Sequence, residues 1–171
     1  MVLYTRQKFL KIAIFAALCA GVSAFGAPEL VEVTADNFFA DEVKQISILT
    51  GNVKIKKGSY DTLNSDKVTI HFDAKKQPTK YIATGNAKFK VLVNDKHYDG
   101  QGAVLTYNPV AETYTLEGNA HLHESETKKE VFGELITVNR AKGTYEVKSA
   151  PKGGAGKKPV RLIFQVEDNQ K

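Results

Sequence analysis

The chain has 171 residues, of which 42% are hydrophobic and 25% charged, a balance typical of a folded globular protein and too apolar for wholesale disorder. Its 24 basic and 19 acidic residues give a net charge of +5. Three of the basic residues and the single cysteine lie within residues 1–24, so residues 25–171 carry 21 basic against 19 acidic residues and can form no disulfide. This nearly neutral remainder argues against nucleic acid as a partner.

Residues 1–24 have the layout of a secretory signal peptide. A basic start is followed by the apolar run 12–20 and by small residues that end at Ala24. This pattern predicts cleavage after Ala24 and a location in the periplasm. The alternative is an anchor that stays in the membrane, but the uncharged stretch 12–27 is short of the ~20 residues that a spanning helix needs.

Three later stretches resemble one another and define a repeat. Each has Gly-Asn followed by alternating apolar and polar residues, and its glycines are 34 and then 33 residues apart. Alternation with a period of two predicts half-buried β-strands. The stretches are LTGNVKIKKG (49–58), ATGNAKFKVL (83–92) and LEGNAHLHES (116–125).

Each repeat continues into further strands. The second strands read SDKVTIHF (65–72), GQGAVLTY (100–107) and GELITV (133–138), and third strands begin at Tyr81, Tyr114 and Tyr145. At 8–12 residues for each strand and turn, roughly 12–18 short strands are expected and no helix. We expect one β-domain over residues 25–150, a Gly/Lys-rich loop over 151–159, and a final edge strand, Val160–Val166, with a short tail over 160–171. One repeat cannot bury its apolar face alone, so the units must stack around a continuous apolar interior.

The repeats carry a resemblance to a known family. VEVTADNFF, LTGNVKIKKG followed by SDKVTI, and LEGNAHLHE followed by GELITV resemble the OstA-type domain of lipopolysaccharide-transport proteins, most closely its periplasmic bridge members. The resemblance covers about residues 30–166. The chain departs from the family's frequent Ala-Asp pair with Ser65-Asp66 and Gly100-Gln101. The resemblance implies an all-β fold, a twisted, open-ended β-jelly roll of many short antiparallel strands, that stacks end to end.

The same resemblance implies partners and a site. The implied partners are lipopolysaccharide, through its lipid A, further copies of the chain arranged head to tail, an inner-membrane LptC-like component and an outer-membrane LptD-like component. No cofactor is implied. Strand parity then predicts which side chains line a groove for acyl chains. They are Val31, Val33, Val53, Ile55, Val68, Ile70, Phe72, Ala87, Phe89, Val91, Leu105, Tyr107, Leu116, Ala120, Leu122, Ile136, Val138, Leu162 and Phe164.

Three alternatives stay open at this point. The apolar stripes could pack a dry core in a structural β-repeat protein, as such stripes usually do. The chain could be the membrane-anchored relative of the same transport system. An exported carbohydrate-active enzyme has the least support.

The motifs for chemistry are few, and we predict no enzyme. GGAGKKP lacks the Ser or Thr of a phosphate loop after its lysine and leads into a strand. His121 and His123 could hold a metal with Glu124 or Glu126, but no further ligand follows at a diagnostic spacing, so we predict no metal site and expect both histidines to face solvent. We expect Lys54, Lys56, Lys88 and Lys90 on outward faces, where they keep the protein soluble and protect the sheet edges.

Overall fold

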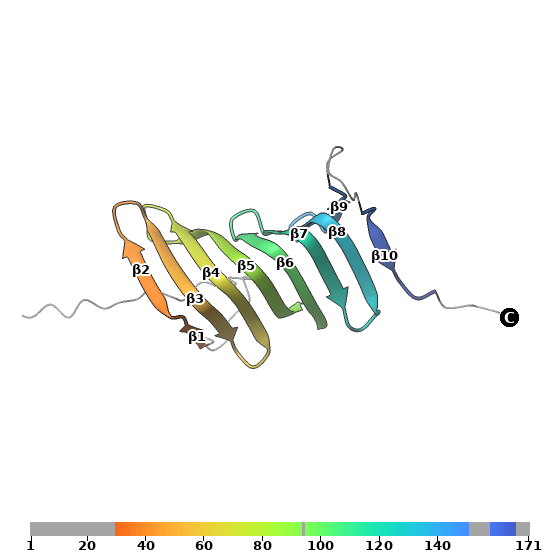
Figure 1. The fold of residues 1–171 in the computed structure, drawn as a ribbon, viewed down its shortest axis with the longest axis horizontal. Helices are drawn as coiled ribbons and strands as arrows, with labels where there is room; N and C mark the ends of the chain where they lie inside the picture. Colours follow the sequence, from red (N-terminus) through yellow and green to blue (C-terminus); the bar gives the residue numbers. More distant parts are fainter. Residues whose placement is uncertain (1–29, 94, 151–157, 167–171) are drawn as a thin grey trace, which may run out of the picture.

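The computed structural model describes residues 30–93, 95–150 and 158–166, and these form one antiparallel β-sheet (Figure 1). Among the described residues no helix is long and apolar enough to cross a membrane. The predicted signal peptide and most of the predicted loop 151–159 lie outside the described residues. The strands are β1 (Val31–Thr34), β2 (Asn37–Asp41), β3 (Ile46–Lys57), β4 (Asp61–Phe72), β5 (Pro78–Val93), β6 (Lys96–Asn108), β7 (Thr113–Glu124), β8 (Lys129–Asn139), β9 (Thr144–Lys148) and β10 (Arg161–Ile163).

The long strands β3 to β8 follow one another across the sheet in chain order, so each pairs with the long strands next to it in sequence. The order is β1-β3-β4-β5-β6-β7-β8-β10, while β2 pairs with the other part of β3 and β9 with the other part of β8. Figure 1 shows β1 and β2 at one end and β9 and β10 at the opposite end. Each end of the sheet is therefore made of two short strands, whose outer edges pair with no other strand of the described residues.

The Gly-Asn pairs bend the long strands. Gly85 and Asn86 both have positive φ, 81° and 49°, and the pairing of β5 shifts between Thr84 and Ala87. Glycine adopts this conformation without strain and asparagine tolerates it better than most residues. The same geometry recurs at Gly51-Asn52 and Gly118-Asn119.

The described residues form fewer strands than the expected 12–18, because the Gly-Asn pairs bend strands without ending them. β5, for example, runs 16 residues through its Gly-Asn pair, where the sequence suggested two separate strands. The final strand is also shorter than predicted, since only Arg161–Ile163 of Val160–Val166 pairs with β8.

The bends lie side by side and form a corner that divides the sheet into two walls. Wall 1 consists of β1, β10 and residues 53–57, 61–65, 87–93, 96–102, 120–124 and 129–133. Wall 2 consists of β2, β9 and residues 46–50, 67–72, 78–84, 104–108, 113–117 and 135–139.

Carboxylates hold the corner at two of the three bends. Asn52 donates its side-chain amide to Asp36 at 3.0 Å, and Asn86 donates to Asp66 at 3.2 Å. At the third bend Ala103 lies over Gly118, and the backbone N–H of Asn119 instead approaches Glu134 from the next strand at 3.5 Å. At this repeat an alanine therefore takes the place that a carboxylate occupies at the other two bends.

Candidate functional site

The interior lies between the two walls and is apolar. Its fully buried side chains include Val53 and Ile55 from wall 1 and Val68, Ile70 and Ile136 from wall 2. Close to the corner wall 1 supplies mostly small side chains, such as Ala87 and Ala120, with Val53 as an exception, and larger ones follow farther away. The walls thus enclose a space that widens away from the corner.

Two connected cavities occupy this space. One of about 60 Å³ is lined from both walls, by Ile55 and Leu63 on one side and by Tyr81 and Tyr107 on the other. The second, of about 250 Å³, lies toward β8 and β9. The two share three lining residues, Phe89, Val91 and Tyr114. A cavity with apolar walls and few polar groups is the usual form of a small-ligand site.

A row of tyrosines follows the side of wall 2 that faces the interior. Tyr81 stacks on Tyr107 with ring centroids 5.9 Å apart, and Tyr107 stacks on Tyr114 at 4.3 Å. The row continues through Val138 to Tyr145 by strand register. A tyrosine ring is apolar along its body and polar at its tip, so such a row suits the boundary between an apolar and a wet region.

One ion pair lies among the interior side chains of wall 1. Glu124 is 9% exposed and accepts hydrogen bonds from Lys96 at 2.7 Å, Thr127 at 2.9 Å and Tyr98 at 3.3 Å. Burial opposes the ionisation of Glu124, but the hydrogen bonds from Lys96 and Thr127 outweigh it and hold the pKa of its carboxyl below the ordinary value. The hydrogen bond to Glu124 in turn raises the pKa of Lys96. Burial, with Tyr145 and Glu124 nearby, raises the pKa of Tyr98, so its hydroxyl stays protonated.

Most of the predicted groove residues face the interior. Sixteen belong to the buried core or pack against it, and Val91 lines both cavities. The parity expected around Phe89 also holds, since Ala87 is buried while Lys88 and Lys90 are exposed. The sixteen are Val31, Val33, Val53, Ile55, Val68, Ile70, Phe72, Ala87, Phe89, Leu105, Tyr107, Leu116, Ala120, Leu122, Ile136 and Val138. Their role in binding lipid stays a prediction.

The structure does not bury the last two predicted residues. Leu162 is 58% exposed and Phe164 61% exposed. Leu162 pairs with Val131, which packs against the core, so it lies on the interior side of wall 1 but at an end that nothing in the described chain covers. Phe164 follows the last paired residue, and strand parity no longer fixes its direction.

Several interior residues were absent from the prediction. They come mainly from the parts of the strands that precede each bend. Where a Gly-Asn pair forms the bend, the alternation of buried residues could have identified them. In β5 the parity of Ala87 and Phe89 continues backward through the Gly-Asn pair to Ala83 and Tyr81. The missed residues are Ala35, Leu49, Leu63, Tyr81, Ala83, Tyr98, Tyr114, Val131 and Val147.

The two histidines pair with carboxylates. His121 Nε2 lies 3.1 Å from Glu130, and His123 Nδ1 lies 2.8 Å from Asp99. Both histidines lie opposite the buried Leu122, as expected, but their side chains are half-buried by these neighbours and do not simply face solvent. No group of three or more potential metal ligands occurs within residues 30–93, 95–150 and 158–166.

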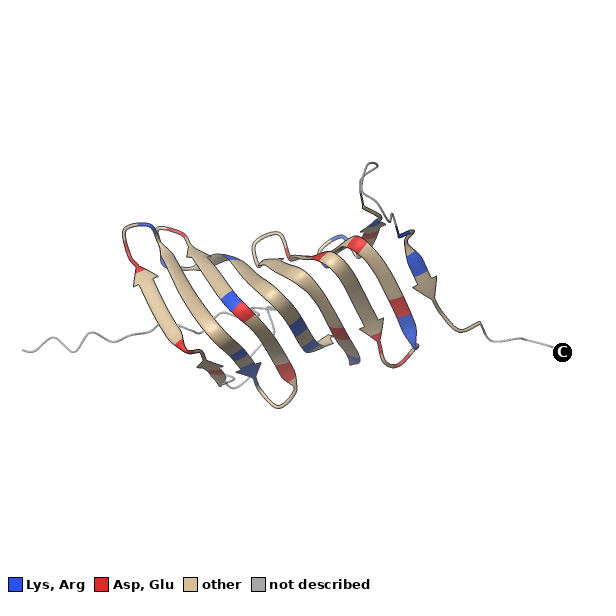
Figure 2. Ribbon diagram, in the orientation of Figure 1, with Lys and Arg blue, Asp and Glu red and all other residues tan. Residues whose placement is uncertain are grey.

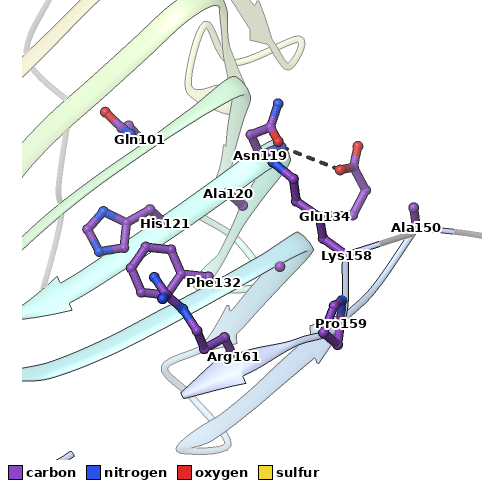
Figure 3. Close-up of a pocket in the computed structure, with 11 residues that line it drawn as sticks. Gln101, Asn119, Ala120, His121, Phe132, Glu134, Ala150, Lys158, Pro159 and Arg161 are labelled. Carbon is purple, nitrogen blue, oxygen red and sulfur yellow. Dashed lines mark hydrogen bonds between the residues drawn. The ribbon is translucent and has the colours of Figure 1, made fainter. Parts of the chain in front are cut away.

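A third pocket, of about 470 Å³, lies on the outer side of wall 1 beside β10 (Figure 3). Here Phe132 lies between His121 and Arg161, with the rings of Phe132 and His121 stacked 4.3 Å apart and the Arg161 guanidinium 4.1 Å from the centre of the Phe132 ring. Register places these three residues beside one another on β7, β8 and β10. The stack fastens the short β10 to the sheet.

The outer surface is of mixed charge. Lys54, Lys56, Lys88 and Lys90 are exposed on the outer side of wall 1, as expected. Figure 2 shows basic and acidic residues interspersed along the sheet, with no surface of a single sign in this view. This distribution is that of an ordinary solvated face.

A bent antiparallel sheet with an apolar interior and a row of tyrosines along one wall defines the protein as an open β-jelly roll. The family model described as LptA/(LptD N-terminal domain) LPS transport protein matches residues 32–144, about two thirds of the chain. The chain belongs to this family and is an LptA-like protein.

Two known proteins are similar to this chain. The chain is 28% identical over 138 residues to the lipopolysaccharide export system protein LptA of Haemophilus influenzae. This alignment covers 78% of this chain and 76% of LptA. A solved structure, that of LptH, the LptA-homologous periplasmic component of the lipopolysaccharide transport device of Pseudomonas aeruginosa, matches with a TM-score of 0.66 and 15% identity. That match covers 81% of this chain and 96% of LptH and establishes the fold.

Proposed function

We propose that this protein carries lipopolysaccharide through the periplasm, with the acyl chains of lipid A between its two walls. The observation that carries the proposal is the apolar space between the walls, which widens away from the corner. Membership of the lipopolysaccharide-transport family supports it. Each methylene of an acyl chain costs about 0.8 kcal/mol when it is exposed to water, so a carrier needs such an interior. The protein catalyses no reaction in this role.

Stacking of copies would make the interior continuous between the membranes. β1 and β10 end wall 1, and β2 and β9 end wall 2. β1 runs in the same direction as β8, and β10 runs opposite to β8, so β1 and β10 run in opposite directions. When two copies stack head to tail, β10 of one copy can therefore pair with β1 of the next in the antiparallel manner. The same holds for β9 and β2. Unpaired edges are ready templates for such pairing. An inner-membrane LptC-like component and an outer-membrane LptD-like component are the partners we propose at the two ends.

Photo-crosslinking tests the location of the lipid. A photoreactive residue in place of Phe89, which lines both cavities, is expected to capture lipopolysaccharide, while one in place of the exposed Lys88 is not. Phe89→Asp is expected to give a folded, exported protein that carries no lipid, because a charge is unfavourable among acyl chains by several kcal/mol. Equal capture at both positions, or capture at neither, would contradict an interior site.

Truncation tests the stacking. Removal of residues 160–171 deletes β10 and the exposed Leu162 while leaving β1–β9 in place. Oligomers that form with rising concentration are expected to disappear, and circular dichroism is expected to show an unchanged sheet. Oligomers that persist at the same concentration in the truncated protein would rule out this end as the interface.

The second candidate is the membrane-anchored component of the same transport system, in which the uncharged stretch 12–27 would be the anchor. Carbonate extraction of membranes separates the two, because a retained anchor keeps the protein in the pellet and a cleaved leader releases it. A third candidate, a structural β-repeat protein with a dry core, predicts that purification without detergent yields no bound lipopolysaccharide.

A further inference from the structure

The strands keep one register along the corner. In wall 2, the pairing of each two neighbouring strands, continued by one residue toward the corner, places their corner residues opposite each other. Gly-Asn strands (β3, β5 and β7), which turn the corner with a Gly-Asn pair, alternate with single-residue strands (β4, β6 and β8), which turn it with one residue. From β2 to β9 the aligned residues are Asp36, Gly51, Asp66, Gly85, Ala103, Gly118, Glu134 and Ser149. Every pair of neighbouring strands thus follows the same rule.

β9 and β10 together correspond to the last strand of this series. Glu134 lies opposite Ser149 by the register of wall 2 and opposite Pro159 by the continued register of wall 1. On its other side Glu134 lies opposite Gly118 in wall 2 and Asn119 in wall 1, and these two residues are adjacent in β7. β9 and β10 are therefore the two halves of one Gly-Asn strand, with additional residues of the chain between them.

β1 and β2 together correspond to the first strand, which is of the single-residue kind. Asp36 lies opposite Gly51 by the register of wall 2 and opposite Asn52 by that of wall 1, as Asp66 does from the other side. Within the sheet a single-residue strand follows each of the Gly-Asn strands β3, β5 and β7. The sheet thus begins with the kind of strand that would come next after its last one.

We propose that copies of this chain join in the register of the corner, so that Ser149 of one copy lies opposite Asp36 of the next. This inference rests on the proposed stacking and names the residues that meet in it. The corner and the interior then continue from copy to copy without a step, since the joint repeats the rule that holds within each copy. The facing interior residues, with that of the next copy second, are Val147 and Phe38, Tyr145 and Ala40, and Leu162 and Val33.

The side chains at these positions fit the register. In wall 2, Val147 packs against the core, and Phe38 faces the interior because its partner on β3 is the buried Leu49. In wall 1, Leu162 and Val33 lie on the interior side likewise. Phe38 and Leu162 are 52% and 58% exposed in the single chain, and the joint covers both. Apolar side chains therefore meet on the interior side of both walls.

Neighbouring registers fit less well. A slip by one residue sets the interior side chains of one copy on the outer side of the next. A slip by two residues places either Val147 opposite Asp36 of the next copy or, in the other direction, Tyr145 opposite Glu42 of the next copy. A carboxylate beside interior side chains is unfavourable unless it is paired. Among these registers, that of the corner sets apolar residues against apolar residues.

Disulfide formation between two copies tests the register. One chain carries Val147→Cys or Tyr145→Cys and the other carries Phe38→Cys or Ala40→Cys, and all of them carry Cys19→Ser so that no other cysteine is present. The two chains are mixed at a concentration at which oligomers form and are then oxidised gently. Opposite residues of antiparallel strands lie within reach of a disulfide, whereas residues displaced by two positions are about 7–8 Å apart.

Each variant serves as its own control, because it takes part in one matched and one displaced combination. The matched combinations are positions 147 with 38 and 145 with 40, and the displaced ones are 147 with 40 and 145 with 38. The matched combinations are expected to form disulfide-linked dimers at least about tenfold faster than the displaced ones. In wall 1, Leu162→Cys is likewise expected to react faster with Val33→Cys than with Val31→Cys.

The outcomes separate this inference from the function beneath it. Equal rates in all four combinations, or faster reaction in the displaced ones, overturn the register and leave the stacking in place as long as the unmodified chain forms oligomers. An unmodified chain that stays monomeric at every concentration overturns the stacking and the register together. Capture of lipopolysaccharide by a photoreactive residue at position 89 reports on the carrier independently of both.

Discussion

Gly85 lies in close contact with Asp66 at the corner, and replacement of this glycine is expected to unfold the sheet at a lower denaturant concentration. Gly85 has φ +81°, and a Cβ added there would lie 2.9 Å from the Cβ of Asp66 and closer still to its carboxylate oxygen. Gly85→Ala therefore meets two penalties at once, one in the backbone and one from overlap.

The magnitude follows from a comparison with Gly143. Gly143 also has positive φ, +63°, but nothing lies within 4 Å of an added Cβ, so Gly143→Ala carries the backbone penalty alone, about 1–2 kcal/mol. Overlap with Asp66 adds about 1–3 kcal/mol at Gly85. Gly85→Ala is thus expected to lower the free energy of unfolding by ~2–5 kcal/mol.

Urea denaturation followed by circular dichroism measures both variants, and an unchanged slope shows that the unfolded state is the same. The decisive step is to repeat Gly85→Ala in an Asp66→Gly background, where the overlap is gone. There its cost is expected to fall to that of Gly143→Ala. An equal loss at Gly85 and Gly143, or a Gly85 penalty that persists without Asp66, would refute the account of the corner as a close contact.

Three further outcomes are expected. Ile136→Ala, at a site 1% exposed, is expected to lower the free energy of unfolding in urea by ~2–5 kcal/mol, and a loss below that range would mean that the walls collapse onto the space. The folded pKa of Glu124 lies below its ordinary 4.5, so Glu124 stabilises the fold above pH 4.5, and this stabilisation is lost as the pH falls through the folded pKa. Glu124→Gln is expected to reduce the loss of unfolding free energy at acid pH. An unaltered dependence of the unfolding free energy on acid pH would show that Glu124 does not contribute to it. Arg161→Ala removes the cation over Phe132 and is expected to speed amide exchange in β10 with little change in global stability, so protection that stays intact would show that the stack does not fasten β10.

The architecture could be predicted from the sequence because two patterns reinforce each other. Alternation on either side of Phe89 gives the strand, and the Gly-Asn pair at 85 and 86 gives the bend, since both positions adopt positive φ. The repeat of this arrangement at near-equal spacing then predicts stacked units. The strand count was wrong because a turn and a bend within a strand use the same residue types.

The interior could be predicted only in part, because parity behaves differently in alternate strands. In β5 the bend consists of two residues, so Tyr81, Ala83, Ala87 and Phe89 keep one parity through it. In β4 one residue, Asp66, lies at the corner, and the buried positions change from odd to even. No glycine marks that change in the sequence.

The cavity between the walls was beyond prediction for a different reason. Tyr98 and Tyr145 line it from strands that are not paired, so no register connects them. Their position around one cavity depends on the angle at the corner, which the sequence pattern does not specify. Contacts within a wall follow from alternation, whereas contacts between walls require the folded structure.

The corner also makes this protein extendable in fixed steps. One repeat of 33 or 34 residues is a hairpin of two long strands, and neighbouring strands lie about 4.8 Å apart, so one repeat adds close to 10 Å to the sheet. Because a hairpin contributes one strand in each direction, its insertion or deletion leaves the directions of β1, β2, β9 and β10 unchanged. Under the proposed stacking, chains of different length could therefore join the same filament, and the length of the filament could change by whole hairpins without any alteration of the strand edges that pair.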